Sequence, residues 1–254
     1  MNEEMNKTQQ ESETLAPVES NNETKSGLPI HVYFLIAIAM VMTSFASILI
    51  RFAGIGITDI DPTLHPADAS VIAFWRLLFA TIGMFLGAVF TRNLKEFKKV
   101  NLKADMPLLI LSGLALAVHF ATWNLSLQMT SVGSSITIVY LLPLFTLILS
   151  VIFLKEKVSR WQILAIILTV SGAVIVGVSD FSFESIQNLY GDLFALAGGI
   201  SGAVYFTIGR KKRERLDIFS YATIVYGLCT IFLFIFRTWV LIMVITRIPL
   251  LNSF

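Results

Sequence analysis

The sequence is poor in charge and in the residues that build catalytic and metal sites. Charged residues make up 14% of its 254 residues, whereas a soluble globular chain carries about a quarter. The single cysteine, Cys229, cannot form an intrachain disulfide. No CxxC, HExxH or GxxxxGK[ST] motif occurs, and no GxGxxG follows a strand pattern. We therefore expect no enzymatic activity, no cofactor and no bound metal.

Long apolar runs dominate the chain instead. Hydrophobic residues account for 56% of it. The runs cover roughly 30–50, 69–91, 107–127, 132–154, 161–178, 190–208 and 218–236, and most are close to the about 20 residues that a helix needs to cross a bilayer. Backbone amides in lipid must bond within their own segment, so runs of this kind form helices. The sequence predicts an all-α, polytopic transmembrane helix bundle with about seven spans.

The charges between these runs alternate along the chain. Thirteen of the nineteen basic residues lie in the three loops after the second, fourth and sixth runs. Short loops rich in lysine and arginine stay in the cytoplasm, so we expect a multi-pass protein of the cell membrane with a cytoplasmic N-terminus. The basic cluster at 210–215 is better explained by this rule, with contact to anionic lipids, than by nucleic-acid binding.

The two ends of the chain differ from the runs between them. Residues 1–28 hold six glutamates and no aromatic residue, which predicts a disordered acidic tail. Residues 237–254 are apolar but too short for a full span by the usual length, and predict a partial span or an interfacial segment.

A proline and several polar side chains lie at membrane depth in the third and fourth runs. Pro143 is in the middle of its run and should kink that helix. Polar groups at this depth usually face a bundle interior or a water-filled path. They form a candidate substrate cavity or gate, although hydrogen bonding between helices explains them equally well. The candidates are His119, Trp123, Asn124, Gln128, Tyr140 and Pro143.

Arg76 is the most informative single charge, because it lies near the start of the second run. It could attract an anionic or carboxylate-bearing substrate into a polar cavity. The favoured alternative is an interfacial anchor, or a salt bridge to Asp68, since arginines near helix ends usually snorkel to the interface.

The order of several short motifs resembles a known family. Trp75-Arg76 opens the second run, Asn124-Leu-Ser-Leu-Gln128 closes the third, and Gly133-Ser-Ser begins the fourth. Pro143-Leu and Leu154-Lys-Glu156 follow, then Trp161-Gln162 with Gly172, and Tyr190-Gly191-Asp192. In this order the motifs resemble the ten-helix drug/metabolite transporters of the EamA type, which are built from two inverted five-helix repeats.

The resemblance implies a central cavity between the repeats, alternating access and a small organic metabolite as cargo. It marks Arg76, Asn124 and Tyr140 as cavity or gate positions. Glu156 and Gly172 match motif positions that we interpret as structural, with Glu156 pairing or capping at the end of its helix. Residues 29–178 correspond to the first repeat, and residues 179–254 to an incomplete second repeat with helices at about 190–208 and 218–236.

The short second repeat leaves two functional hypotheses open. Only 65 residues remain from Tyr190 onward, against a first repeat more than twice as long. The first hypothesis is a transporter of a small organic solute, with export as the expected direction. The second is a truncated, non-transporting membrane protein or a partner subunit that must oligomerise, for example as a homodimer through the glycine pairs at 83/87 and 198/202.

Overall fold

The computed structural model describes residues 30–55, 69–180 and 186–251. Every regular element in these ranges is a helix, which confirms the all-α prediction. The acidic tail predicted for residues 1–28 lies outside the described residues. The chain divides into two compact units, 1–43 and 44–254. The first contains the N-terminal half of one apolar helix, and the second contains the helical bundle discussed below.

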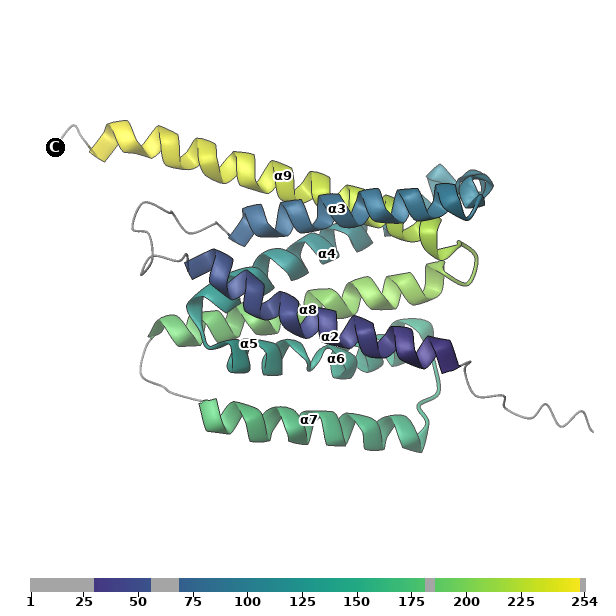
Figure 1. Cartoon of the computed structure of the whole chain (residues 1–254), viewed down its shortest axis with the longest axis horizontal. Helices are drawn as coiled ribbons and strands as arrows, with labels where there is room; N and C mark the ends of the chain where they lie inside the picture. The colour runs from purple at the N-terminus through teal and green to yellow at the C-terminus, as the bar shows by residue number, and fades with distance from the viewer. Residues whose placement is uncertain (1–29, 56–68, 181–185, 252–254) are drawn as a thin grey trace, which may run out of the picture. The chain divides into compact units, whose positions relative to one another are not determined.

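The helices follow the apolar runs closely (Figure 1). In chain order they are α2 (Ile30–Ile55), α3 (Ala69–Phe90), the 3-10 helix η1 (Asn93–Lys99), α4 (Leu102–Met129), α5 (Val132–Val139), α6 (Leu142–Leu149), the π-helix η2 (Ser150–Leu154), α7 (Arg160–Asp180), α8 (Ile186–Lys212) and α9 (Ile218–Leu251).

Within the described residues, five helical segments are long and apolar enough to cross a membrane, which identifies a polytopic membrane protein. They are Ser70–Phe90, Lys103–Met129, Val132–Leu154, Ile186–Lys212 and Ile218–Trp239. Two further apolar segments, Val32–Met42 and Arg160–Gly172, are shorter. Beyond Trp239, helix α9 continues to Leu251 instead of ending near residue 236. Arg237 does not stop it, and no glycine or proline occurs between Gly227 and Pro249.

The fourth run is interrupted at the place that Pro143 predicts. Helix α5 ends at Val139, and α6 begins at Leu142 with the proline in its first turn. Proline has no N–H to donate, so the carbonyl of Val139 loses its usual helical partner. That carbonyl faces Gly199 of α8, where an added Cβ would lie 3.4 Å from the oxygen. The break is therefore packed against a glycine of the neighbouring helix.

Helix α8 lies at the centre of the second unit. It contacts α4, α5 and α6, while α9 contacts α3 and α4 (Figure 1). Small residues let these helices approach closely. The buried residues of α8 are Gly191, Ala195, Gly198, Gly199, Gly202, Ala203, Thr207 and Gly209. The pair at 198/202 is thus used inside the chain, against α4.

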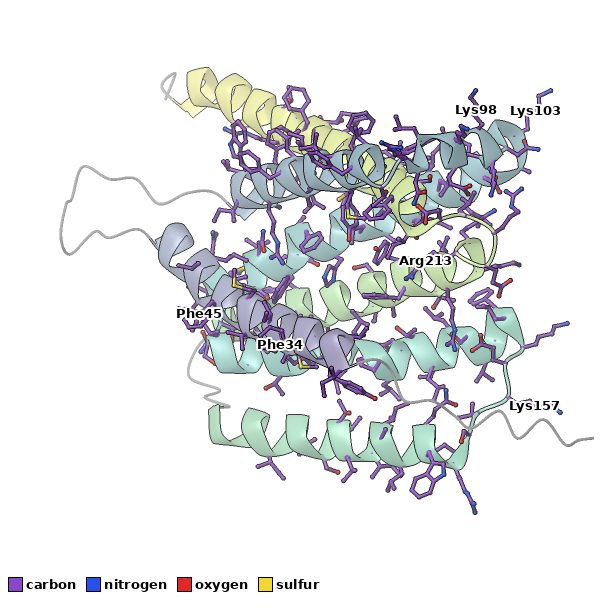
Figure 2. All side chains as sticks on the ribbon, turned by 45° about the vertical axis from the view of Figure 1, so that its right-hand side comes forward. Phe34, Phe45, Lys98, Lys103, Lys157 and Arg213 are labelled. Carbon is purple, nitrogen blue, oxygen red and sulfur yellow. The ribbon has the colours of Figure 1, made fainter. Side chains whose placement is uncertain are left out.

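The basic loops gather at one end of the bundle. Figure 2 shows Lys98, Lys103, Lys157 and Arg213, from three different loops, near this end. At the same end Asp105, in the first turn of α4, has a side chain only 3% exposed. Its Oδ1 lies 2.9 Å from Lys212 Nζ, and its Oδ2 pairs with Arg215 and accepts from the Asn101 N–H. One carboxylate therefore joins the start of α4 to the end of α8.

Replacing Asp105 with alanine should destabilise the bundle. The change leaves Lys212, whose side chain is 13% exposed, without its carboxylate, and we expect a loss of about 1–3 kcal/mol. Thermal unfolding of purified protein in detergent measures it. The matched control is Glu96→Ala, which removes the more exposed pair with Lys99 and should cost no more than about 0.5 kcal/mol. Equal effects of the two changes would contradict this role of Asp105.

Candidate functional site

Helix α4 carries most residues of the candidate site. Asn101 caps its N-terminus by accepting from the N–H groups of Lys103 and Ala104. From there the helix runs without interruption, so residues three or four positions apart share a face. His119 and Trp123, four positions apart, share one side of the helix, and Asn124 lies about 100° further round than Trp123. All three are buried, and Asn124 is completely enclosed. Gln128, one turn further, is half-buried.

Arg76 of α3 reaches this face and lies against aromatic rings. Its guanidinium carbon is 4.9 Å from the centroid of Phe120 and 5.4 Å from the centroid of Trp123. Within 6 Å a cation is attracted to the negative face of such rings. The structure therefore brings Arg76, His119 and Trp123 together, and it adds Phe120, which the sequence does not single out. Asp68, the salt-bridge partner considered for Arg76, lies outside the described residues.

Two donors in this cluster lack an acceptor. Arg76 Nη1 and Trp123 Nε1 are both buried, and the described residues offer neither of them a hydrogen-bond partner. A buried donor left without a partner costs about 1–3 kcal/mol. Each of the two groups can donate to a ligand acceptor such as a carboxylate or carbonyl oxygen.

His119 connects the cluster to α8. Its Nδ1 lies 2.7 Å from the carbonyl oxygen of Gly198, and because a carbonyl only accepts, Nδ1 carries the proton. The ring stacks on Trp123, with centroids 5.8 Å apart. A Cβ placed on Gly202 would lie 2.8 Å from His119 Nδ1. The imidazole is thus fixed by a hydrogen bond, a stacked ring and a glycine that leaves it room.

Tyr140 and Pro143 mark the break between α5 and α6. The Tyr140 side chain is 51% exposed, in contrast to the buried residues of α4. Pro143 lines a separate groove of about 370 Å³ together with residues of α6, α7 and α8, among them Gln162 and Arg210. The candidates therefore divide into an enclosed group around Arg76 and a more exposed pair at the break.

The two structural motif positions have different surroundings. Glu156 pairs with Arg210 in the last turn of α8, with Oε2 3.0 Å from Nη1, rather than with the lysines beside it. A Cβ on Gly172 of α7 would meet nothing within 4 Å.

The sequence did not predict a hydroxyl network at the other end of α8, although most of its members lie in the motifs described above. Ser134 donates to Asp192 Oδ1 at 2.7 Å, and the hydroxyls of Ser126 and Ser135 are 2.6 Å apart. Gly191 packs against Thr130, where a Cβ would come within 2.8 Å. The Gly133-Ser-Ser and Tyr190-Gly191-Asp192 motifs therefore meet in space. The family resemblance assigns one motif to the first repeat and the other to the second, and this was the signal that could have predicted the contact.

Substitution of Gly202 by alanine should destabilise the contact of α4 with α8. The new Cβ would lie 2.7 Å from Leu142 Cδ1 and 2.8 Å from the fixed His119 ring, and overpacking of this kind costs about 1–3 kcal/mol. Thermal unfolding in detergent tests the change. Gly172→Ala, which enters open space, is the matched control and should cause no loss. If the Gly202→Ala protein were as stable as the control, α4 and α8 could move apart to accept a methyl group without cost, and the prediction would be wrong.

Comparison with known proteins gives one family and several relatives. The model of the EamA-like transporter family matches residues 30–178. An uncharacterized transporter from Archaeoglobus fulgidus is 26% identical over 172 residues, which cover 67% of this chain and 58% of the relative. The uncharacterized transporter YyaM from Bacillus subtilis is 31% identical over 143 residues, 55% of this chain and 46% of the relative.

A further relative has a named cargo. The S-adenosylmethionine uptake transporter of Rickettsia bellii is 29% identical over 172 residues, which cover 63% of this chain and 53% of that protein. The chain therefore spans about half the length of these curated relatives. No solved structure matches it.

Proposed function

The chain belongs to the EamA-like transporter family, and we propose that it carries a small organic metabolite across the membrane by alternating access. One observation carries the proposal. Arg76 is held among aromatic rings in an apolar bundle, and two buried donors there lack an acceptor among the described residues. Charge at membrane depth is costly and usually serves a pathway for a polar solute.

The surroundings of the site support a two-state mechanism. In the family resemblance α4, α5 and α6 belong to the first repeat and α8 to the second, and transporters of this kind rock one repeat against the other. His119 and the glycines of α8 lie at the contact between these parts. The break at Tyr140 and Pro143 provides a place where one span can bend. We assign the bend as the moving element and the close α4–α8 contact as the fixed pivot.

The proposed direction is export, which rests on the resemblance to drug/metabolite exporters. The relatives from Rickettsia are named uptake transporters. Transport measured in sealed vesicles that hold the protein in one known orientation decides between the two directions. The solute is then added at only one face of the protein.

Metabolite profiling of cells tests transport without a known substrate. Cells that express the full chain should differ from vector controls in the ratio of external to internal concentration of at least one small organic solute. S-adenosylmethionine is included as a labelled probe. Arg76→Gln removes the cation, and Trp123→Phe keeps a ring but removes the indole donor. We expect the first change to abolish the difference and the second to reduce it about tenfold, the usual range for a lost hydrogen bond to a charged or buried group.

A second cation–π pair in the chain supplies the control. Arg160 lies 6.0 Å from the ring centroid of Trp161, which is 69% exposed. Arg160→Gln and Trp161→Phe should leave the solute ratio unchanged. Transport would be rejected if cells with correctly inserted wild-type protein matched the vector controls for every solute, and the site would be rejected if the Arg76 and Arg160 variants behaved alike.

A second candidate function is a subunit that works as a homodimer. The observation in its favour is Gly83 of α3, where a Cβ would meet no atom of the described residues within 4 Å. Phe79, Ile82 and Leu86 beside it are 64%, 45% and 45% exposed. A small residue between apolar neighbours allows a second helix to approach closely in lipid.

The mass of the purified protein in detergent, measured by light scattering, tests this candidate. If α3 forms the contact, Gly83→Leu should convert dimer to monomer, because the larger side chain separates the helices. Gly172→Leu, on the open face of α7, should leave the dimer intact. A wild-type protein that is monomeric at all concentrations would exclude the homodimer.

A further inference from the structure

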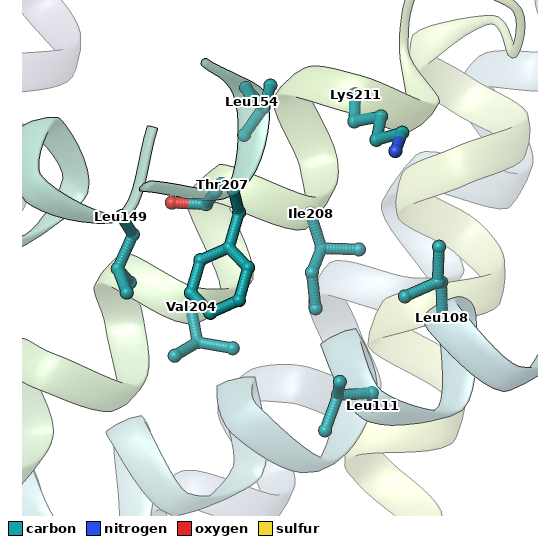
Figure 3. Close-up of a pocket in the computed structure, with 9 residues that line it drawn as sticks. Leu108, Leu111, Leu149, Leu154, Val204, Thr207, Ile208 and Lys211 are labelled. Carbon is teal, nitrogen blue, oxygen red and sulfur yellow. The ribbon is translucent and has the colours of Figure 1, made fainter. Parts of the chain in front are cut away.

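A cavity at the basic end of the bundle has no role in the proposed transport site. Its volume is about 350 Å³, and it lies between α4, the end of the α6–η2 segment and α8 (Figure 3). Apolar side chains form most of its wall. The lining residues are Leu108, Leu111, Leu149, Phe153, Leu154, Val204, Thr207, Ile208 and Lys211.

The cavity changes from apolar to charged along its length. In Figure 3, Lys211 and Leu154 lie at one rim, and Leu111 and Val204 lie at the opposite side. Lys211 is in the last turn of α8, so Thr207 lies one helical turn deeper and Val204 about two turns deeper. The deep part therefore suits hydrocarbon, while the residues that line the cavity include a single ammonium group and no carboxylate.

Lys211 is the basic residue left for a ligand at this rim. Its neighbours Arg210 and Lys212 form ion pairs with Glu156 and Asp105, respectively. Within the described part of the chain Lys211 forms no ion pair, and its side chain is exposed. A lysine beside an apolar surface extends its ammonium toward the level of the lipid head groups.

We propose that this cavity binds an anionic phospholipid, with one acyl chain between α4, η2 and α8 and its phosphate at Lys211. A soluble anion would leave the leucine-lined part empty, and a zwitterionic lipid would bring its own cation close to the phosphate that pairs with Lys211. The bound lipid comes from the leaflet at the basic end of the spans, where lysine and arginine clusters attract anionic head groups. The site is distinct from the Arg76 cluster, so its test is independent of transport.

Retained lipid, counted by native mass spectrometry, tests the proposal. The full chain is reconstituted in equal amounts of phosphatidylglycerol and phosphatidylcholine, then extracted into mild detergent. We expect phosphatidylglycerol to be retained about fivefold over phosphatidylcholine, as one lysine near the head groups predicts. Lys211→Gln should bring the ratio close to one, and Leu111→Trp, which fills the cavity, should reduce retention of both lipids.

Lys98→Gln is the matched control. Lys98 is an exposed lysine at the same end of the bundle but outside the cavity, so its loss should leave the retention ratio unchanged. Gel filtration confirms that each variant is a discrete particle. The proposal is overturned if the two lipids are retained equally by wild-type protein, if Leu111→Trp retains as much lipid as wild type, or if Lys98→Gln lowers the ratio as far as Lys211→Gln.

Discussion

The close contact between α4 and α8 is the constraint on which the rest of the structure depends. Lipid supplies no hydrophobic driving force between apolar helices, so their association relies on close packing and on hydrogen bonds. The glycines of α8 provide the first, and the bond from His119 to the Gly198 carbonyl provides the second. That bond also orients the ring on which Trp123 stacks. Packing of the bundle and geometry of the candidate site therefore share the same atoms.

The small residues of α8 also accommodate the broken fourth span. A proline in a span frees a carbonyl that water cannot reach, and neighbouring protein must accommodate it. Here the freed carbonyl of Val139 faces Gly199, on the helix that also receives His119. The glycines of α8 thus form a rigid contact with α4 and also pack against the bend between α5 and α6. A rigid side and a bending side around one helix are what a rocking mechanism needs.

The sequence predicted the helices and the bend, because apolar length and proline act locally. It also named His119 and Trp123 as cavity candidates. For Arg76 the residues alone favoured an interfacial anchor, and the family resemblance gave the cavity position. Phe120 was missed because the sequence does not distinguish an aromatic residue that contacts a cation from any other aromatic residue in an apolar run. Asp105 was missed because its partner Lys212 is 107 residues away. Tyr140 was placed with the buried group, but its exposure depends on how the broken helix turns.

The carboxylate of Asp105 has a consequence for the order in which the protein is assembled. Its two cationic partners are made more than 100 residues after it. During synthesis α4 enters the membrane long before the end of α8 leaves the ribosome. Until then the Asp105 carboxylate, at the basic end of the bundle, is solvated or pairs with other charges. It cannot yet join α4 to α8. Emergence of the loop after α8 is therefore required before this carboxylate can hold α4 against α8, and α9 must follow before its contacts with α3 and α4 form.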